Sequence, residues 1–362
     1  MTMFVAGGAL NPVKHSHIIV HRAELDTILD HIDKEDSYVV LCGPRQTGKT
    51  TLLYQVQSLL NDQGYGVAYL DLSGLKDLNK GSFYHLISNR IKNSLTKLLE
   101  GNSDNAINPQ TVNDQTSFAD YLKSLSSNTP QARKIILMLD EVGGVPEDVA
   151  ETFFPTLRSF FQQGREPSDD CYLYQRIIVI FAGSLDLSQL IRGHNSPVAN
   201  VCKKVTLTDF SKEQIGQLAR KLNNFSDEGI EITINSVYEW CYGHPYLTQS
   251  LLKLIDESQV CRNLPFDKLP EFIDEIVNRY ILCGGDPNCN HILHYLQKAG
   301  KSWQDAVFKV LHNRQLKTIP YWEDLEVIGV VRRLPDFNYT IHNKVYEKIL
   351  TSFFDSQETT QQ

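Results

Sequence analysis

The sequence of 362 residues contains no apolar stretch long enough to cross a membrane, because a spanning helix needs about 20 consecutive apolar residues. Its first residues, Met1 to Gly8, carry no basic side chain and only a short apolar core, so they do not look like a secretory signal peptide. These two absences argue against the common classes of membrane-spanning and secreted proteins. We therefore expect a cytoplasmic protein with no membrane partner.

The sequence also lacks paired cysteines. Its seven cysteines are scattered and include no Cys-x-x-Cys pair, which predicts reduced thiols rather than a disulfide framework. The group that comes nearest to a metal-binding cluster is Cys283, Cys289 and His291. A fourth ligand is missing there and the spacing differs from that of a zinc knuckle, so we interpret these residues as part of an ordinary loop.

An excess of positive charge is absent as well. The chain carries 35 Lys and Arg against 43 Asp and Glu, a formal net charge of −8 with a pI of about 5.8. Such a chain is not steered as a whole to nucleic acid or to an anionic membrane, although a local basic patch is compatible with it. The length predicts two or three domains, because a single hydrophobic core rarely exceeds about 250 residues.

What the sequence does contain is a phosphate-binding loop. The pattern G-x-x-x-x-G-K-[ST] lies between an apolar, β-branched run at 38–42 and a stretch with helical apolar spacing. Backbone N–H groups and the helix dipole would hold the phosphates of ATP or GTP, with Lys49 on the β- and γ-phosphates and Thr50 on Mg²⁺. The residues assigned to nucleotide binding are Gly43, Pro44, Arg45, Gln46, Thr47, Gly48, Lys49, Thr50 and Thr51. The alternative, a chance glycine-rich turn, is disfavoured by the strand–loop–helix order.

A second decisive stretch is the apolar run 135–139, which ends in Asp140 and Glu141. A run this apolar predicts a strand buried on both faces of a parallel sheet, with its acids at the carboxyl end beside the phosphate-binding loop. In this Walker B pattern, Asp140 holds Mg²⁺ and Glu141 polarises the attacking water. The alternative is an Asp-Glu pair that only caps the next helix.

Two further candidate residues have weaker support. Arg22 opens an amphipathic stretch before the first strand and either borders the nucleotide base or belongs to a helix packed on the sheet edge. Ser184 ends the strand-like run 176–184, which begins at Arg176 and is otherwise largely apolar. In ATPases with an extra strand between the P-loop and Walker B strands, this position senses the γ-phosphate, but a serine that caps the helix 185–191 explains it equally well.

The order of elements predicts an α/β fold with a doubly wound, mostly parallel P-loop sheet. Strand-like runs at 38–42, 67–72, 135–141, 176–184 and 201–210 alternate with helices, and the chain then becomes helical. Near the end, two strands at 330–334 and 338–341 between helices make a winged-helix pattern. We predict a lead-in at 1–35, an ATPase core at 36–210, a helical lid at 211–285, a winged-helix-like domain at 286–355 and a tail at 356–362.

Nearly the whole chain resembles the AAA-like P-loop ATPases of cyanobacteria and other bacteria, which are close to the STAND class of signal-transduction ATPases and to archaeal-type ATPases. Beyond the phosphate-binding loop and Leu139-Asp140-Glu141, the resemblance rests on six further segments. In chain order they are Gly7-Gly8-Ala9-Leu10, Phe153-Phe154 with Leu157-Arg158-Ser159, Leu190-Ile191-Arg192 with Ser196-Pro197, Leu207-Thr208-Asp209-Phe210, Gly243-His244-Pro245-Tyr246-Leu247-Thr248-Gln249 and His342-Asn343-Lys344-Val345-Tyr346. The last two are more discriminating than the phosphate-binding loop, which many unrelated families share.

The resemblance implies a nucleotide domain, a lid and a winged helix that use ATP and Mg²⁺. By analogy, His244 and Pro245 approach the nucleotide and couple its state to the lid. The sequence departs from many STAND proteins, because Ser184 stands where they carry an arginine, and Arg158 and Arg192 are only candidates for an arginine finger. It has no internal repeat of 20–50 residues, so we expect a bare switch core or a subunit with separate partners.

Three functions follow from these observations, and we rank them in order. The first is an ATP-dependent conformational switch in signalling or defence that works with a protein partner or by self-assembly. The second is a DNA-handling ATPase, which is less favoured because residues from Tyr280 onward carry nine Lys/Arg and nine Asp/Glu. A P-loop kinase or GTPase comes last, because no Asn-Lys-x-Asp signature is present and Asp140-Glu141 favours hydrolysis.

Overall fold

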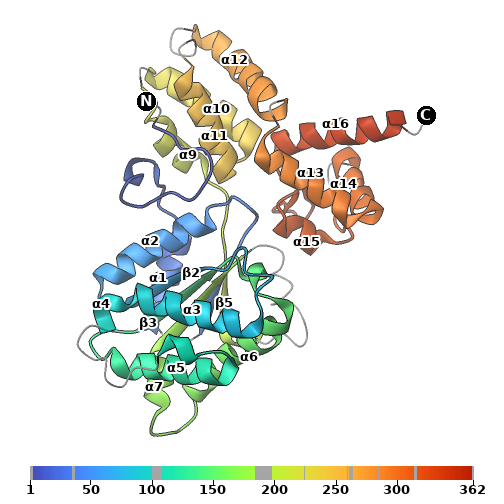
Figure 1. Ribbon diagram of the computed structural model, residues 1–362. Coiled ribbons are helices and arrows are strands. Elements are labelled where there is room, and N and C mark those ends of the chain that lie inside the picture. The colour runs from blue at the N-terminus through green and yellow to red at the C-terminus, as the bar shows by residue number, and fades with distance from the viewer. Residues whose placement is uncertain are drawn as a thin grey trace. The chain divides into compact units, whose positions relative to one another are not determined.

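The computed structural model describes residues 3–34, 37–99, 108–183, 198–223, 225–258, 260, 264–283, 285–313 and 316–360. The chain divides into two compact units (Figure 1). We call Arg22–Cys42 with Lys49–Leu207 the core unit, and Met1–His21, Gly43–Gly48 and Thr208–Gln362 the helical unit. Within the described residues, no helix has the length and apolar character needed to cross a membrane.

The described part of the core unit contains a parallel sheet of five strands in the order β2-β3-β4-β1-β5. The strands are β1 (Tyr38–Cys42), β2 (Gly66–Asp71), β3 (Ile135–Asp140), β4 (Ile177–Ala182) and β5 (Cys202–Thr206). Strand β4 lies between β1 and β3, so the expected extra strand between the P-loop and Walker B strands is present. The predicted α/β class with a doubly wound parallel sheet is confirmed.

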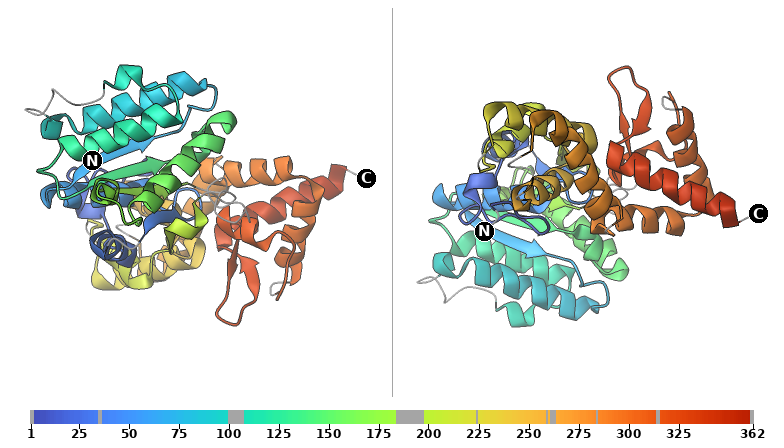
Figure 2. Two further views of the ribbon diagram at one scale, coloured as in Figure 1. Left: turned by 90° about the horizontal axis from the view of Figure 1, so that it is seen from below. Right: turned by 90° about the horizontal axis from the view of Figure 1, so that it is seen from above.

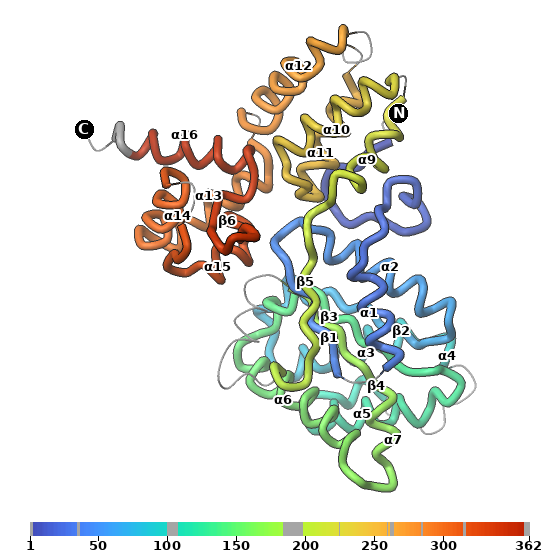
Figure 3. Tube along the Cα trace, turned by 180° about the vertical axis from the view of Figure 1, so that it is seen from behind, coloured from blue at the N-terminus to red at the C-terminus, as the bar shows by residue number. Residues whose placement is uncertain are grey.

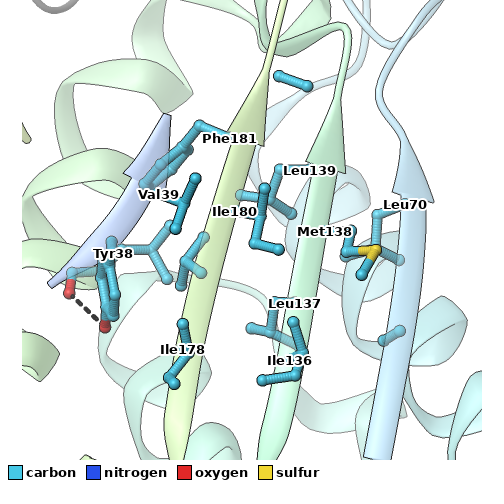
Figure 4. Close-up of a cluster of buried hydrophobic side chains, with 14 of the residues drawn as sticks. Tyr38, Val39, Leu70, Ile136, Leu137, Met138, Leu139, Ile178, Ile180 and Phe181 are labelled. Atoms are coloured by element: carbon cyan, nitrogen blue, oxygen red, sulfur yellow. Dashed lines mark hydrogen bonds between the residues drawn. The ribbon is translucent and has the colours of Figure 1, made fainter. Parts of the chain in front are cut away.

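The apolar runs of the sequence become the centre of this sheet. Every residue of β1, β3 and β4 is buried, whereas the edge strands β2 and β5 have exposed positions. Figure 4 shows aliphatic side chains of β3 and β4 packed with Tyr38, Val39 and Leu70 of the neighbouring strands. Because central strands are covered on both faces, they read as continuous hydrophobic runs, and this is why the sequence identified them.

Helices cover both faces of the sheet (Figure 2). Helices α1 and α2 pack together, and α3, α5 and α6 form a second group. The connection from β1 to β2 crosses the sheet in the direction opposite to the later connections, so the right-handed crossover rule places α2 on the face opposite α3, α5 and α6. The helices are α1 (Ala23–Lys34), α2 (Lys49–Asp62), α3 (Lys80–Ser94), α4 (Thr96–Leu99), α5 (Gln115–Asn128), α6 (Glu147–Gln163) and α7 (Cys171–Gln175).

The helical unit can be followed from α9 to α16 in Figure 3. Its helices are α9 (Lys212–Ala219), α10 (Asp227–Cys241), α11 (Pro245–Glu257), α12 (Leu269–Ile276), α13 (Pro287–Ala299), α14 (Lys301–Asn313), α15 (Trp322–Val327) and α16 (Lys344–Thr360). Ser211 caps α9, and its hydroxyl accepts a hydrogen bond from the Gln214 N–H at 3.2 Å.

The two predicted strands near the end of the chain form an antiparallel hairpin. Strands β6 (Val331–Arg333) and β7 (Tyr339–Ile341) pair with Arg332 opposite Thr340, and Leu316 adds a bridge to Tyr339. The hairpin lies between α15 and α16 in the chain. Assignment of this region as a winged helix, and the boundaries of the five predicted segments, stay predictions.

Candidate functional site

The segment from Gly43 to Gly48 connects β1 to α2 and makes a tight turn. Gln46 and Gly48 have φ angles of 61° and 93°, in the left-handed region that a glycine adopts at low cost and other residues rarely adopt. The Thr47 hydroxyl closes the turn by donating to the Pro44 carbonyl at 2.8 Å. Helix α2 begins at Lys49, so the first N–H groups of the helix, which lack intrahelical acceptors, follow directly on this turn.

A group of polar residues meets at the carboxyl ends of β2 and β3, and we call Thr50, Tyr69, Asp140 and Glu141 the carboxylate site. Asp140 ends β3 with a side chain that is only 1% exposed. The Thr50 hydroxyl donates to its Oδ2 at 2.7 Å, and the Tyr69 hydroxyl donates to the same atom at 2.9 Å. The backbone N–H of Glu141 donates to Oδ1 at 3.0 Å. The structure therefore brings together Thr50 and Asp140, which the sequence assigns to Mg²⁺.

The donor set of Thr50 and Asp140 fits a magnesium ion. A hydroxyl and a carboxylate are hard oxygen ligands, and Mg²⁺ that accompanies nucleotide phosphates typically takes one or two protein carboxylates. Among the described residues, no group of three or more His, Cys, Asp or Glu side chains lies close enough together to hold a metal ion. Of the two cysteines in the group considered for a metal in the sequence, Cys289 is buried and Cys283 is exposed.

Glu141 directly follows Asp140 and has an unusual backbone. Its φ and ψ are 52° and 53°, a left-handed conformation that costs a non-glycine residue about 1–2 kcal/mol. Its side chain is exposed, in contrast to that of Asp140. Strain of this kind is often retained where a side chain must be presented to a ligand, and this is compatible with the predicted role of Glu141 toward water.

Tyr69 is the residue of this site that the sequence analysis did not identify. Burial raises the pKa of its hydroxyl, and the nearby Asp140 carboxylate raises the pKa further. The ring packs edge-on against Tyr54 of α2 with centroids 5.0 Å apart. The available signal was a tyrosine in an otherwise aliphatic strand, Val67-Ala68-Tyr69-Leu70, but the sequence could not show that its hydroxyl reaches the neighbouring strand.

The other predicted residues of the core unit have separate surroundings. Arg22 precedes α1, is 5% exposed and forms an ion pair with Glu24, with Nε and Oε2 3.7 Å apart. Arg158 lies in α6, and its Nε atom is buried without a hydrogen-bond partner in the described part of the chain. Ser184 and Arg192 lie outside the described residues.

In the helical unit, Arg45 and Pro44 of the phosphate-binding loop lie beside the C-terminal elements. A guanidinium nitrogen of Arg45 is 3.0 Å from Nδ1 of His291 in α13. Burial lowers the pKa of His291, and the Arg45 charge lowers it further. A Cβ atom at Gly329 would lie 2.8 Å from Cβ of Pro44, so the turn before β6 approaches the loop closely.

His244 and Pro245 begin α11. His244 is fully buried, and its Nδ1 accepts the Leu247 N–H at 3.4 Å, so this side chain caps the helix that Pro245 opens. The preceding Gly243 has φ +80°, and a Cβ atom there would be 2.0 Å from the carbonyl oxygen of Phe210. Because Phe210 N–H also donates to the Gly243 carbonyl at 2.8 Å, these two segments lie in direct contact and glycine is required.

Three of the motifs that carried the family resemblance meet in space inside the helical unit. Asp209 accepts a hydrogen bond at 2.8 Å between its Oδ2 and Nε2 of His342. The His342 ring lies 6.0 Å from the His244 ring, and Tyr346 lies 5.9 Å from His244, measured between centroids. We call Asp209, His244, His342 and Tyr346 the histidine cluster. The sequence singled out each motif separately and gave no sign that they touch.

Comparisons with known proteins agree with this architecture. The family model of the AAA-like domain matches residues 9–269. No curated protein sequence matches the chain. Among solved structures, the Walker-type ATPase PABY2304 of Pyrococcus abyssi has a TM-score of 0.64 at 16% identity, over 95% of this chain and 98% of that chain. At this identity the similarity shows a shared fold.

Two further structural similarities have TM-scores below 0.5. The ORC2 protein of Aeropyrum pernix, in its ADPNP-ADP complexes, has a TM-score of 0.48 at 15% identity over 97% of each chain. The STAND protein PH0952 of Pyrococcus horikoshii, with a tetratricopeptide repeat sensor, has a TM-score of 0.38 at 17% identity over 91% of this chain and 42% of that chain. Because the AAA-like family model spans well over half of the sequence, the chain belongs to the AAA-like domain family.

Proposed function

We propose that this protein binds ATP with Mg²⁺ at residues 43–51 and hydrolyses it, and that it uses the nucleotide as a conformational switch. The observation that carries the proposal is the contact between Thr50 and Asp140, 2.7 Å apart at the carboxyl end of β3, with the exposed Glu141 directly after it. Membership of the AAA-like ATPase family supports the same chemistry.

Each residue has a separate role in this proposal. The backbone N–H groups of 43–48 and the ammonium group of Lys49 bind the phosphates. Thr50 and Asp140 would hold Mg²⁺, which would supply positive charge to offset that of the phosphates. The Glu141 carboxylate accepts a hydrogen bond from the attacking water and so orients and polarises it. Arg22 borders the base, and Ser184 senses the γ-phosphate, as the sequence patterns indicate.

The switch part of the proposal concerns the helical unit. His244 and Pro245 would couple the state of the nucleotide to the lid helices, as the family resemblance implies. The histidine cluster supports this idea, because it ties the segment after β5 to the start of α11 and to the start of α16. A displacement of α11 would therefore also displace C-terminal elements. A protein partner or a second copy of this chain that binds these elements would respond to the change.

A DNA-handling role is the second candidate, and one observation favours it. Arg333 and Phe337 are exposed on the β6–β7 hairpin, with the guanidinium 4.8 Å from the ring centroid. The neighbouring Arg332 is less available for contact with DNA, because its guanidinium stacks 3.5 Å from the Tyr242 ring centroid and donates to the His342 carbonyl. Anisotropy of labelled duplex DNA tests this role. Salt-sensitive binding that weakens in Arg333→Ala would favour it over the switch alone.

Equilibrium titration of a fluorescent ATP analogue, with and without Mg²⁺, tests nucleotide binding. We expect Lys49→Ala to weaken ATP binding about 10- to 100-fold, because hydrogen bonds to charged groups contribute about 1.5–3 kcal/mol. The matched control is Lys97→Ala, which removes an exposed lysine of α4 in the same unit and should bind normally. Equal affinities of wild type and Lys49→Ala would overturn the proposed site.

Light scattering on the Glu141→Gln variant then separates two forms of the switch. Assembly with ATP and Mg²⁺ but not with ADP would indicate that the output is self-association. An unchanged mass in both states would indicate that a partner protein reads the lid, and pull-downs with each nucleotide would follow.

A further inference from the structure

A tyrosine on the edge strand contacts the acidic residue that we assign to Mg²⁺. Tyr69 lies on β2, and its hydroxyl donates to Oδ2 of Asp140 on β3 at 2.9 Å. In the strand register, Tyr69 is opposite Met138 and Asp71 is opposite Asp140, so the contact is a diagonal one between neighbouring strands. Long aromatic side chains can span this diagonal, whereas the small and aliphatic residues beside Tyr69 cannot.

Ring packing and strand pairing restrain the position of the Tyr69 hydroxyl. The Tyr69 ring is held edge-on against Tyr54 of α2, at a centroid distance of 5.0 Å and an interplanar angle of 65°. The backbone on either side is fixed by parallel pairing with β3. A tyrosine hydroxyl can donate one proton, and that of Tyr69 donates it to the Asp140 carboxylate, which as an ionised group can only accept.

The hydrogen bonds to Asp140 determine how its carboxylate can serve a cation. A carboxylate has about four acceptor positions, two on each oxygen. Oδ2 accepts from Thr50 and Tyr69, and Oδ1 accepts from the backbone N–H of Glu141. A threonine hydroxyl can donate its proton to Asp140 and still offer a lone pair to a cation. The hydrogen bond from Tyr69 is therefore a second restraint on Oδ2, beside that from Thr50. The remaining acceptor position of Oδ1 stays available to the cation or to a water molecule bound to it.

We propose that Tyr69 is a positioning residue for Mg²⁺ binding, which fixes the orientation of the Asp140 carboxylate by a hydrogen bond from the neighbouring strand. The inference rests on the proposed nucleotide function and adds to it a residue outside the two sequence motifs. Partners that orient a metal-binding side chain typically change metal affinity or activity about 10- to 100-fold when they are removed. Tyr69 acts through Asp140 and needs no contact with the nucleotide.

The test is a Mg²⁺ titration of ATP binding in Tyr69→Phe, which keeps the ring and removes only the hydroxyl. Affinity for a fluorescent ATP analogue in EDTA should match that of wild type. The Mg²⁺ concentration that gives half of the metal-dependent gain in affinity should rise about 10-fold. The matched control is Tyr121→Phe, which removes another buried hydroxyl of the core unit, one that donates to the Ser88 carbonyl at 3.0 Å.

A double-mutant cycle distinguishes positioning from general damage. In an Asp140→Asn background, Tyr69→Phe should cause no further change in Mg²⁺ dependence, because the carboxylate that it orients is gone. If Tyr69→Phe alone keeps the wild-type Mg²⁺ dependence while Asp140→Asn loses it, the role of Tyr69 is overturned and the nucleotide function stands. If wild type shows no Mg²⁺-dependent gain in affinity, the proposed function fails and the inference fails with it. Equal shifts in Tyr69→Phe and Tyr121→Phe would also overturn it.

Discussion

The carboxylate site and the histidine cluster are both groups of polar side chains that contact one another, but their exposure to solvent differs. At the carboxylate site, three donors converge on Asp140, and the next residue, Glu141, is exposed. In the histidine cluster, His244, His342 and Tyr346 are 0%, 6% and 1% exposed. The first arrangement leaves one group accessible to a ligand from solvent, whereas the second encloses almost all of its ring surfaces.

From this difference we expect the carboxylate site to contribute to the free energies of ligand binding and catalysis, and the histidine cluster to contribute to the free energy of folding. A buried carboxylate beside an exposed one is suited to act on a ligand, so changes there should alter binding or rate with little effect on folding. Buried, hydrogen-bonded side chains from segments far apart in the chain hold those segments together, and removing one leaves its partner with an unsatisfied group. Changes in the histidine cluster should therefore lower the free energy of unfolding first.

The largest expected effect belongs to the carboxylate site. Glu141→Gln keeps the size and hydrogen-bonding reach of the side chain but removes the carboxylate that we propose polarises water. We expect kcat for ATP hydrolysis to fall by about 10²- to 10⁴-fold, the usual contribution of a general base, with ATP affinity and melting temperature retained. Steady-state phosphate release, equilibrium ATP binding and thermal melting measure the three quantities.

The control for this variant is Glu147→Gln, which alters an exposed acid in the first turn of α6 in the same unit. It should hydrolyse ATP at the wild-type rate. Unchanged hydrolysis in Glu141→Gln would remove that residue from the proposed role. A large loss of melting temperature would contradict the division between a functional and a structural region.

The next effect belongs to the backbone beside the histidine cluster. Gly243→Ala should lower the free energy of unfolding by about 2–5 kcal/mol, because it combines an unfavourable positive φ with overpacking against the Phe210 carbonyl 2.0 Å away. The matched variant is Gly64→Ala, whose φ is +83° but whose Cβ would have no atom within 4 Å. It should lose about 1–2 kcal/mol. Chemical denaturation of both proteins measures the difference, and equal losses would mean that the close approach to Phe210 relaxes at little cost.

Much of the core unit could be predicted from the sequence, for reasons that particular residues make clear. Strands β1, β3 and β4 are buried on both faces and therefore appear as continuous apolar runs. The contact of Thr50 with Asp140 was expected, because the ends of parallel strands and the start of the helix after β1 lie at the same edge of the sheet. Such features are encoded by residues that are close in the chain or by a fixed topology.

The parts of the structure that could not be predicted depend on contacts between residues far apart in the chain, which a local sequence pattern does not indicate. The hydroxyl of Tyr69 reaches Asp140 across 71 positions in the chain, and the pairing of Asp209 with His342 spans 133 positions. A tyrosine in a strand or a histidine before a helix has many uses, and the one realised here depends on register and on the packing of separate elements. The sequence therefore indicated which motifs matter without showing that three of them form one cluster.

The smallest effect that we predict concerns the hydrogen bond within the histidine cluster. His342→Ala removes the imidazole that bonds to Asp209, and both side chains are shielded, at 7% and 21% exposure. We expect the free energy of unfolding to fall by about 1–3 kcal/mol, the usual result of deleting one partner of a buried hydrogen bond. Denaturant unfolding of His342→Ala, Asp209→Asn and the double variant measures the coupling between them, with the exposed His17→Ala of the same unit as the control. Additive losses would mean that the two side chains do not stabilise each other. A change in ATP affinity with no loss of stability would mean that this hydrogen bond serves the proposed nucleotide switch without stabilising the fold, and it would end the contrast with the carboxylate site.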